Sequence, residues 1–141
     1  MTDLITSTLS AARFDDANGW GNDRALWTDV ATQLVALAPA LVGSEKQVAW
    51  ATDLRAAATV RIAQVLLTDL GTDARDAHFG QGASERIVTR RTEARATRLS
   101  LVARALGTTS AKAWIDARSE MGAALGQTPA ALTALLDRCG F

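Results

Sequence analysis

A capping box followed by a four-residue repeat of apolar side chains is the feature that most constrains the fold of this chain. Ser44 and Gln47 stand three residues apart, so each side chain can accept a hydrogen bond from the other residue's backbone N–H at a helix start. After them, apolar residues recur every four positions, at Trp50, Leu54, Ala58, Ile62 and Leu66. Side chains at this spacing share one face of an α-helix. The pattern predicts a helix that begins after Ser44 and ends at Gly71, a natural C-cap.

Helix signals recur in the rest of the chain and predict an all-α protein. Thr128 followed by Pro129 is typical of a helix start, and Gly107 and Gly140 suit helix ends. Alanine, the best helix former, accounts for 29 residues, and tyrosine, which favours strands, is absent. Besides the helix after Ser44, the signals predict helices over residues 22–38, 84–106, 110–125 and 128–139.

The length of 141 residues suits one domain, because two independent cores would need a longer chain. We therefore expect a single-domain bundle of about five helices over residues 1–141. Residues 1–21 are predicted to be an irregular N-terminal segment, in which 1–12 could form a short helix or a strand and 15–19 are turn formers. Residues 71–83 contain three glycines and are predicted to be the main loop.

Composition also bears on where the protein works. No run approaches 18 consecutive apolar residues, so no membrane span is predicted. Residues 1–14 lack a basic region followed by an apolar one, so no signal peptide is expected. The single cysteine, Cys139, cannot form an internal disulfide and suits a reducing compartment. A cytoplasmic protein is the expectation.

The sequence carries no motif for catalysis, a cofactor or a metal. There is no phosphate-binding loop, nucleophile elbow, zinc-protease motif or pair of closely spaced cysteines. His78 is the only histidine, and although Asp73 and Asp76 lie near it, no second histidine or cysteine stands at ligand spacing. We expect neither an enzyme nor a cofactor or metal site.

Arginines crowd the predicted helix over residues 84–106, where six basic residues face two acidic ones, Glu85 and Glu93. Two interpretations are open. The arginines could form a solvated face that is partly balanced by the acidic N-terminal region, since residues 1–40 hold five acidic and two basic residues. Alternatively, they could bind a protein or the phosphates of a nucleic acid. The candidate partner-binding residues are Arg86, Arg90, Arg91, Arg95 and Arg98, of which Arg91, Arg95 and Arg98 share one face of the helix.

Two other arginines fall within apolar stripes. Arg55 lies on the face marked by Leu54 and Ile62, and Arg118 lies on that of Trp114. A buried guanidinium without a partner costs roughly 3–5 kcal/mol. We therefore predict that these arginines reach water, pair with an aspartate such as Asp53 or Asp116, or make a cation–π contact, and that at least one of them is mostly buried. The alternative is that they contact an anion or a partner.

The tryptophans are the largest apolar side chains available for packing. Trp50 and Trp114 lie on helical apolar stripes and are predicted to be core residues. Trp20 stands between two glycines and is predicted to be the most exposed of the four.

Two short motifs resemble a signature of small bacterial proteins, many of them encoded by phages and mobile elements. The first motif runs from Gly43 to Arg55 and the second from Ser110 to Arg118. The residues that carry the resemblance are Ser44, Lys46, Gln47, Trp50 and Arg55, then Lys112, Trp114, Asp116 and Arg118. The resemblance implies a phage or mobile-element origin and a core of paired helices, with no established chemistry.

These observations lead to two function hypotheses. The first is a non-catalytic protein of a phage or mobile element that binds a host protein, in its specific form an anti-defence inhibitor of the anti-CRISPR kind. The second is a nucleic-acid-binding accessory or regulatory protein that uses the arginine-rich helix 84–106. Leucines on the helical surface would also allow a homodimer.

Overall fold

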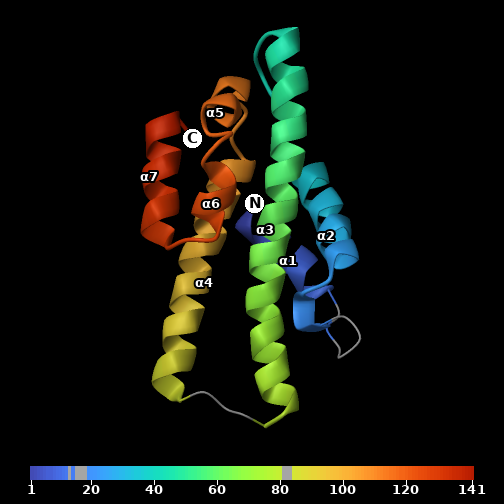
Figure 1. Cartoon of the computed structure of the whole chain (residues 1–141), viewed down its shortest axis with the longest axis vertical. Coiled ribbons are helices and arrows are strands. Elements are labelled where there is room, and N and C mark those ends of the chain that lie inside the picture. Colours follow the sequence, from blue (N-terminus) through green and yellow to red (C-terminus); the bar gives the residue numbers. More distant parts are fainter. Residues whose placement is uncertain (13, 15–18, 81–83) are drawn as a thin grey trace.

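A central helix of 34 residues, α3 (Glu45–His78), runs along most of the molecule in this computed structural model (Figure 1). The structure describes residues 1–12, 14, 19–80 and 84–141. The predicted capping box begins α3: the Ser44 hydroxyl accepts from the Gln47 N–H at 3.3 Å, and the Gln47 side chain accepts from the Ser44 N–H at 3.1 Å. The start of this helix is therefore confirmed.

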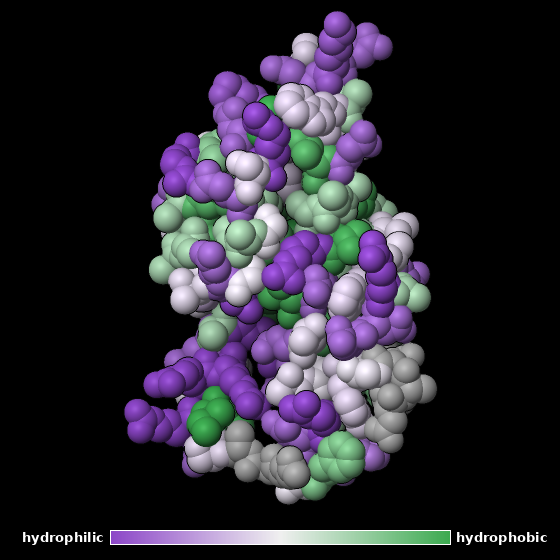
Figure 2. Space-filling model, in the orientation of Figure 1, coloured by the Kyte–Doolittle hydropathy of each residue, from purple (hydrophilic) through white to green (hydrophobic). Residues whose placement is uncertain are grey.

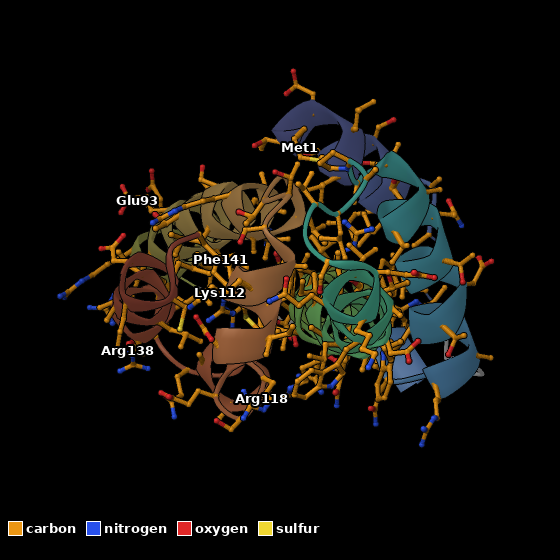
Figure 3. All side chains as sticks on the ribbon, turned by 90° about the horizontal axis from the view of Figure 1, so that it is seen from above. Met1, Glu93, Lys112, Arg118, Arg138 and Phe141 are labelled. Carbon is orange, nitrogen blue, oxygen red and sulfur yellow. The ribbon has the colours of Figure 1, made fainter. Side chains whose placement is uncertain are left out.

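The remaining elements lie to two sides of α3 (Figure 3), and α2, η1, α5 and α6 pack closest to it. On one side lie α1 (Thr2–Ser10), the short 3-10 turn η1 (Gly19–Gly21) and α2 (Arg24–Leu37). On the other side lie α5 (Ala111–Asp116), α6 (Met121–Leu125) and α7 (Pro129–Cys139). Helix α4 (Glu85–Leu106) runs antiparallel to α3 and joins the two groups.

All seven α-helices in the described part of the chain belong to one bundle, and five of them have at least seven residues. The core is assembled from nearly all of them. Its largest buried side chains include Ile5, Leu34, Ile62, Leu66, Leu106, Trp114, Leu125 and Leu136. The predicted all-α bundle is confirmed.

The N-terminal segment is more regular than predicted. Residues Thr2–Ser10 form α1, which buries Ile5 and Leu9 against the bundle. Short helices take their stability from tertiary packing more than from their own propensity, so local periodicity was insufficient to separate helix from strand here. Of the turn formers predicted at 15–19, residues 15–18 lie outside the described part of the chain.

The predicted main loop over 71–83 is largely wrong, because α3 passes through Gly71 and continues to His78. Gly71 is buried under η1. A Cβ atom on Gly71 would lie 1.4 Å from the backbone oxygen of Trp20, and one on Gly21 would lie 2.3 Å from that of Leu67. These glycines allow two backbones to touch, which is a different use from the helix end that the sequence suggested.

The predicted helix over 110–125 is divided into α5 and α6 by a turn after Asp116. No glycine or proline marks this turn in the sequence. Trp114, Met121 and Leu125 are nevertheless all buried, as their shared apolar stripe indicated. The other predicted boundaries are confirmed, with Asp23 and Thr128 as side-chain N-caps and Gly140 in a left-handed C-cap.

We expect Gly71→Ala to lower the free energy of unfolding by about 3 kcal/mol, because a methyl group cannot fit between two backbones without moving η1 away from α3. Urea denaturation measures this loss. Gly122→Ala is the matched control, since a Cβ at this position of α6 meets no atom within 4 Å. It should be neutral or stabilise by about 0.5–1 kcal/mol. Equal effects of the two changes would contradict the close approach.

Candidate functional site

The two motifs that carry the resemblance lie against each other at the start of α3 and α5. An isolated parallel bridge joins Val42 to Ser110. The Val42 N–H donates to the Thr109 carbonyl at 2.7 Å, and the Ala111 N–H donates to the Val42 carbonyl at 3.0 Å. Ser110, in the bridge, and Ser44, two residues after Val42, cap two neighbouring helices.

Trp114 is a core residue, as predicted. Its side chain is 1% exposed, and its indole N–H donates to the Thr108 carbonyl at 3.4 Å. Its ring meets that of Phe141 edge-on, with centroids 5.0 Å apart. The contact links α5 to the C-terminal residue, Phe141.

Trp50 was predicted to be a core residue, and this is wrong, since 48% of it is exposed. At the start of α3 the buried face runs through Ala51 and Arg55, and a helix turns by about 100° per residue, so Trp50 projects away from this face. The guanidinium carbon of Arg118 lies 5.2 Å from the centre of the Trp50 ring, and Arg118 Nη1 donates to the Ile115 carbonyl at 2.7 Å. The predicted cation–π contact between the motifs is confirmed.

Arg55 is the buried arginine that the sequence predicted, at 7% exposure. Its partner is a backbone carbonyl, that of Pro39, to which Nη1 donates at 2.7 Å. Burial lowers the pKa of Arg55, and its Nε has no hydrogen-bond partner among the described residues. The suggested pairing with Asp53 is wrong. Because Pro39 lies between α2 and α3, the hydrogen bond from Arg55 attaches this connecting segment to α3.

Other motif residues lie at the surface. Lys46 is exposed on the first turn of α3. Asp116, suggested as a partner for the embedded arginines, pairs instead with Lys112 one helical turn before it. The hydrogen bond and the charge of Asp116 raise the pKa of Lys112. The shared signature thus contains caps, one core residue and two arginines held by neutral groups.

The arginines of α4 face an unexpected set of carboxylates on α3. Arg91 Nη1 lies 3.3 Å from Asp73 and 3.2 Å from Asp76. Arg95 binds Asp69 through Nε at 2.6 Å and Asp73 through Nη2 at 2.5 Å. We call Asp69, Asp73, Asp76, Arg91 and Arg95 the ion-pair ladder.

The ladder changes the electrostatics expected for this helix. Burial alone would lower the pKa of Arg95, but hydrogen bonds and charge attraction from Asp69 and Asp73 outweigh it and raise that pKa. The balancing charge therefore comes from α3, and the predicted balance by the N-terminal region is wrong for these arginines. The sequence did not predict these ion pairs, because residues 71–83 are expected to be a loop. Only on a continuous helix does the four- and three-residue spacing of Asp69, Asp73 and Asp76 place them on one face.

The other candidate partner-binding residues divide into two groups. Arg98 Nη2 donates to the Gln127 carbonyl at 2.8 Å, so the face shared by Arg91, Arg95 and Arg98 turns toward the protein itself. Arg86 and Arg90 are exposed and take part in none of the ion pairs between described residues. These two remain available to a partner.

Exposed apolar side chains accompany these two arginines. Ile87 and Val88 are 46% and 48% exposed on the first turns of α4. Figure 2 shows this as a small hydrophobic area among hydrophilic side chains at the lower end of the molecule. Phe79, at the end of α3, is also exposed. We call Phe79, Arg86, Ile87, Val88 and Arg90 the end patch.

Beside the end patch, His78 belongs to an aromatic cluster. Its ring lies 5.1 Å from that of Trp20 and 4.9 Å from that of Phe79. Trp20 is half-buried by this contact, so the prediction that it would be the most exposed tryptophan is wrong. No group of three potential metal ligands occurs among the residues that the structure describes.

Comparisons with family models, with curated proteins and with solved structures give no match for this chain. The resemblance to small phage and mobile-element proteins stays a prediction from the two motifs. Within the described ranges, no helix is long and apolar enough to cross a membrane.

The two motif tryptophans should differ sharply in their effect on stability. Trp114→Ala should cost roughly 3–5 kcal/mol because it empties a buried site. Trp50→Ala should cost about 1 kcal/mol, the size of an exposed cation–π contact. Chemical denaturation of the two variants measures the difference, and similar losses would contradict the assigned burial.

The ion-pair ladder should give a measurable coupling between α3 and α4. In a double-mutant cycle of Arg95→Gln and Asp73→Asn, we expect a coupling energy of about 1 kcal/mol in low salt, because the Arg95 end is mostly buried. The coupling should decrease in molar salt. A cycle on the exposed pair of Lys112 and Asp116 is the control and should give a smaller value. A coupling near zero for Arg95 and Asp73 would show that the ladder does not hold the helices together.

Proposed function

We propose that this protein is a non-catalytic binding protein that docks on a partner protein through the end patch. The observation that supports it is the exposure of Ile87 and Val88 between two arginines that have no carboxylate partner in the described structure. Apolar contact supplies affinity in a protein interface, and arginine is enriched there. The partner surface would combine an apolar depression with acidic side chains that meet Arg86 and Arg90.

The charge around the end patch favours a protein over a nucleic acid. Between Asp69 and Arg95, five acidic and five basic residues occur, and the acidic ones include the three aspartates of the ladder. Phosphates approaching α4 would meet these carboxylates, and Arg91 and Arg95 are already engaged with them. Binding of nucleic acid through Arg86, Arg90 and Arg98 is the second candidate, because these three of the five candidate arginines form no ion pair with another described residue.

The resemblance of the two motifs to phage and mobile-element proteins adds a specific version of the proposal. In this version the partner is a host protein in the cytoplasm, such as a component of a defence system, and the protein inhibits it as an anti-CRISPR protein would. A small helical scaffold with an exposed docking end suits inhibition by occupancy, which needs no catalytic group.

The test compares wild type with a double variant, Ile87→Ser and Val88→Ser, in capture experiments from host lysate, followed by binding measurements with the purified captured protein. We expect the variant to lose at least about tenfold in affinity, since it removes the apolar centre of the interface. Val42→Ser is the matched control, because Val42 is also exposed but lies at the opposite end of α3. Equal binding by wild type and the double variant would refute the proposal.

Charge variants separate the two candidate functions. Arg86→Gln with Arg90→Gln should slow association with a protein partner, most visibly in low salt. A mobility-shift titration with random DNA and RNA tests the alternative. Tight, salt-dependent binding of either by wild type, lost in this variant, would favour nucleic acid. Size-exclusion chromatography of the same proteins shows whether the end patch instead joins two copies of the chain.

A further inference from the structure

A cavity of about 180 Å³ lies between α3 and the α5–α6 segment, far from the end patch. Leu54 and Ala58 of α3 line one side, and Trp114 and Met121 line the other. Two guanidinium groups, those of Arg61 and Arg118, complete the lining. The wall is therefore apolar, and the charged groups that border it are both positive.

Arg61 is held in place by neutral groups. Its Nε donates to the Gly122 carbonyl at 3.3 Å, and its Nη1 donates to the Gln64 side-chain oxygen at 2.8 Å. Its Nη2 has no hydrogen-bond partner in the described structure. These contacts fix the plane of the guanidinium against α6 and leave its charge uncompensated. The apolar pattern of α3 did not single out Arg61.

Arg118 is held in the same manner, by the Ile115 carbonyl and the face of Trp50. Figure 3 shows Arg118 at the edge where the α5–α6 segment lies beside α3. None of the ion pairs between described residues includes Arg61 or Arg118, whereas Arg91, Arg95, Arg104 and Arg138 all pair with carboxylates. Two positively charged residues thus border one apolar cavity that has no acidic residue in its lining.

We propose that this cavity binds a small carboxylate that carries one flat apolar ring. Guanidinium groups match the planar geometry of a carboxylate, and Trp114, Leu54 and Met121 offer apolar contact to a ring. The volume suits one ring, since a cavity of about 150 Å³ is large enough for benzene. A small hydrated anion such as phosphate would leave the apolar wall unused, and a neutral ring would leave both charges unpaired.

The site is independent of the proposed docking surface. From Ala58 to Phe79, the rise along α3 corresponds to about 30 Å. The residues of the cavity and those of the end patch do not overlap. Ligand binding at the cavity can therefore be tested, and refuted, independently of the proposed docking on a partner protein.

Benzoate is the probe, and the measurement is a titration of the 15N-labelled full chain followed by amide and indole NMR shifts. We expect saturable, submillimolar binding, with the largest shifts at the Gly122 amide and the Trp114 indole, which lie at the cavity. Benzamide lacks the charge and acetate lacks the ring, so each should bind at least about tenfold more weakly. Equal shifts with acetate and benzoate would overturn the requirement for a ring.

Variants locate the site. Arg61→Gln and Arg118→Gln should each weaken benzoate binding about tenfold, and Ala57→Leu, on the exposed rim of the cavity, should weaken it without removing a charge. Arg24→Gln is the matched control, because it removes an exposed arginine from α2 and should leave binding unchanged. Dispersed NMR spectra show that each variant is folded. The proposal is overturned if wild type shows no saturable shifts in millimolar benzoate, or if the Arg61 and Arg118 variants bind as wild type does.

A second titration, with peptides, distinguishes two sources of an aromatic carboxylate, the C-terminus of a polypeptide and a free small acid. A short peptide that ends in phenylalanine presents a ring and a free carboxylate, and its C-terminal amide lacks the charge. Binding of the acid but not the amide, with an affinity at least equal to that of benzoate, identifies a chain terminus as the source. Benzoate binding with no binding of either peptide identifies a free small acid.

Discussion

The packing of α3 against elements from both ends of the chain is the constraint on which the rest of the structure depends. Its inner face is apolar through Ile62, Leu66 and Leu67, and it meets α2 on one side and α5 on the other. In the last third of α3, Gly71 of the helix and Gly21 of η1 let the two backbones touch directly. Apolar burial supplies the driving force, and the two glycines set the position at which the N-terminal segment docks.

The contact between α3 and α4 is apolar in one part and formed by ion pairs in the other. Leu66, Leu70 and Leu99 surround a small cavity where α1 also packs, and beyond it the facing side chains are those of the ion-pair ladder. Ion pairs at partly exposed positions contribute less stability than buried apolar side chains of similar size. We therefore expect the end formed by the last turns of α3 and the first turns of α4 to be the least stable part of the molecule. The exposed apolar side chains of the end patch lie at this same end.

The arginines illustrate how one residue type takes on different roles in one small protein. Arg55 is buried and fastens a connecting segment, whereas Arg91 and Arg95 bridge two helices through aspartates. Of the arginines that have no carboxylate partner among the described residues, four border the two surfaces to which we assign binding. Arg86 and Arg90 border the end patch, and Arg61 and Arg118 border the cavity. Lack of a carboxylate partner alone does not mark a binding candidate, since Arg55 and Arg98 also lack one and bind backbone carbonyls; the candidates are those that adjoin an exposed apolar surface or an apolar cavity.

Local signals were sufficient for much of the fold, because helix caps and apolar periodicity depend on residues a few positions apart. Ser44 with Gln47, Thr128 with Pro129 and the burial of Trp114 could all be predicted in this way. Features that depend on distant segments could not. Gly71 has the local character of a helix end, yet it lies inside α3, where it admits the backbone of η1. Trp50 continues the apolar repeat, but the buried face of α3 runs through Ala51 and Arg55 and leaves Trp50 exposed. The candidate sites also depend on distant segments. Folding brings the aspartates of α3 next to Arg91 and Arg95, and it places Arg61 and Arg118, which are far apart in the sequence, at one cavity.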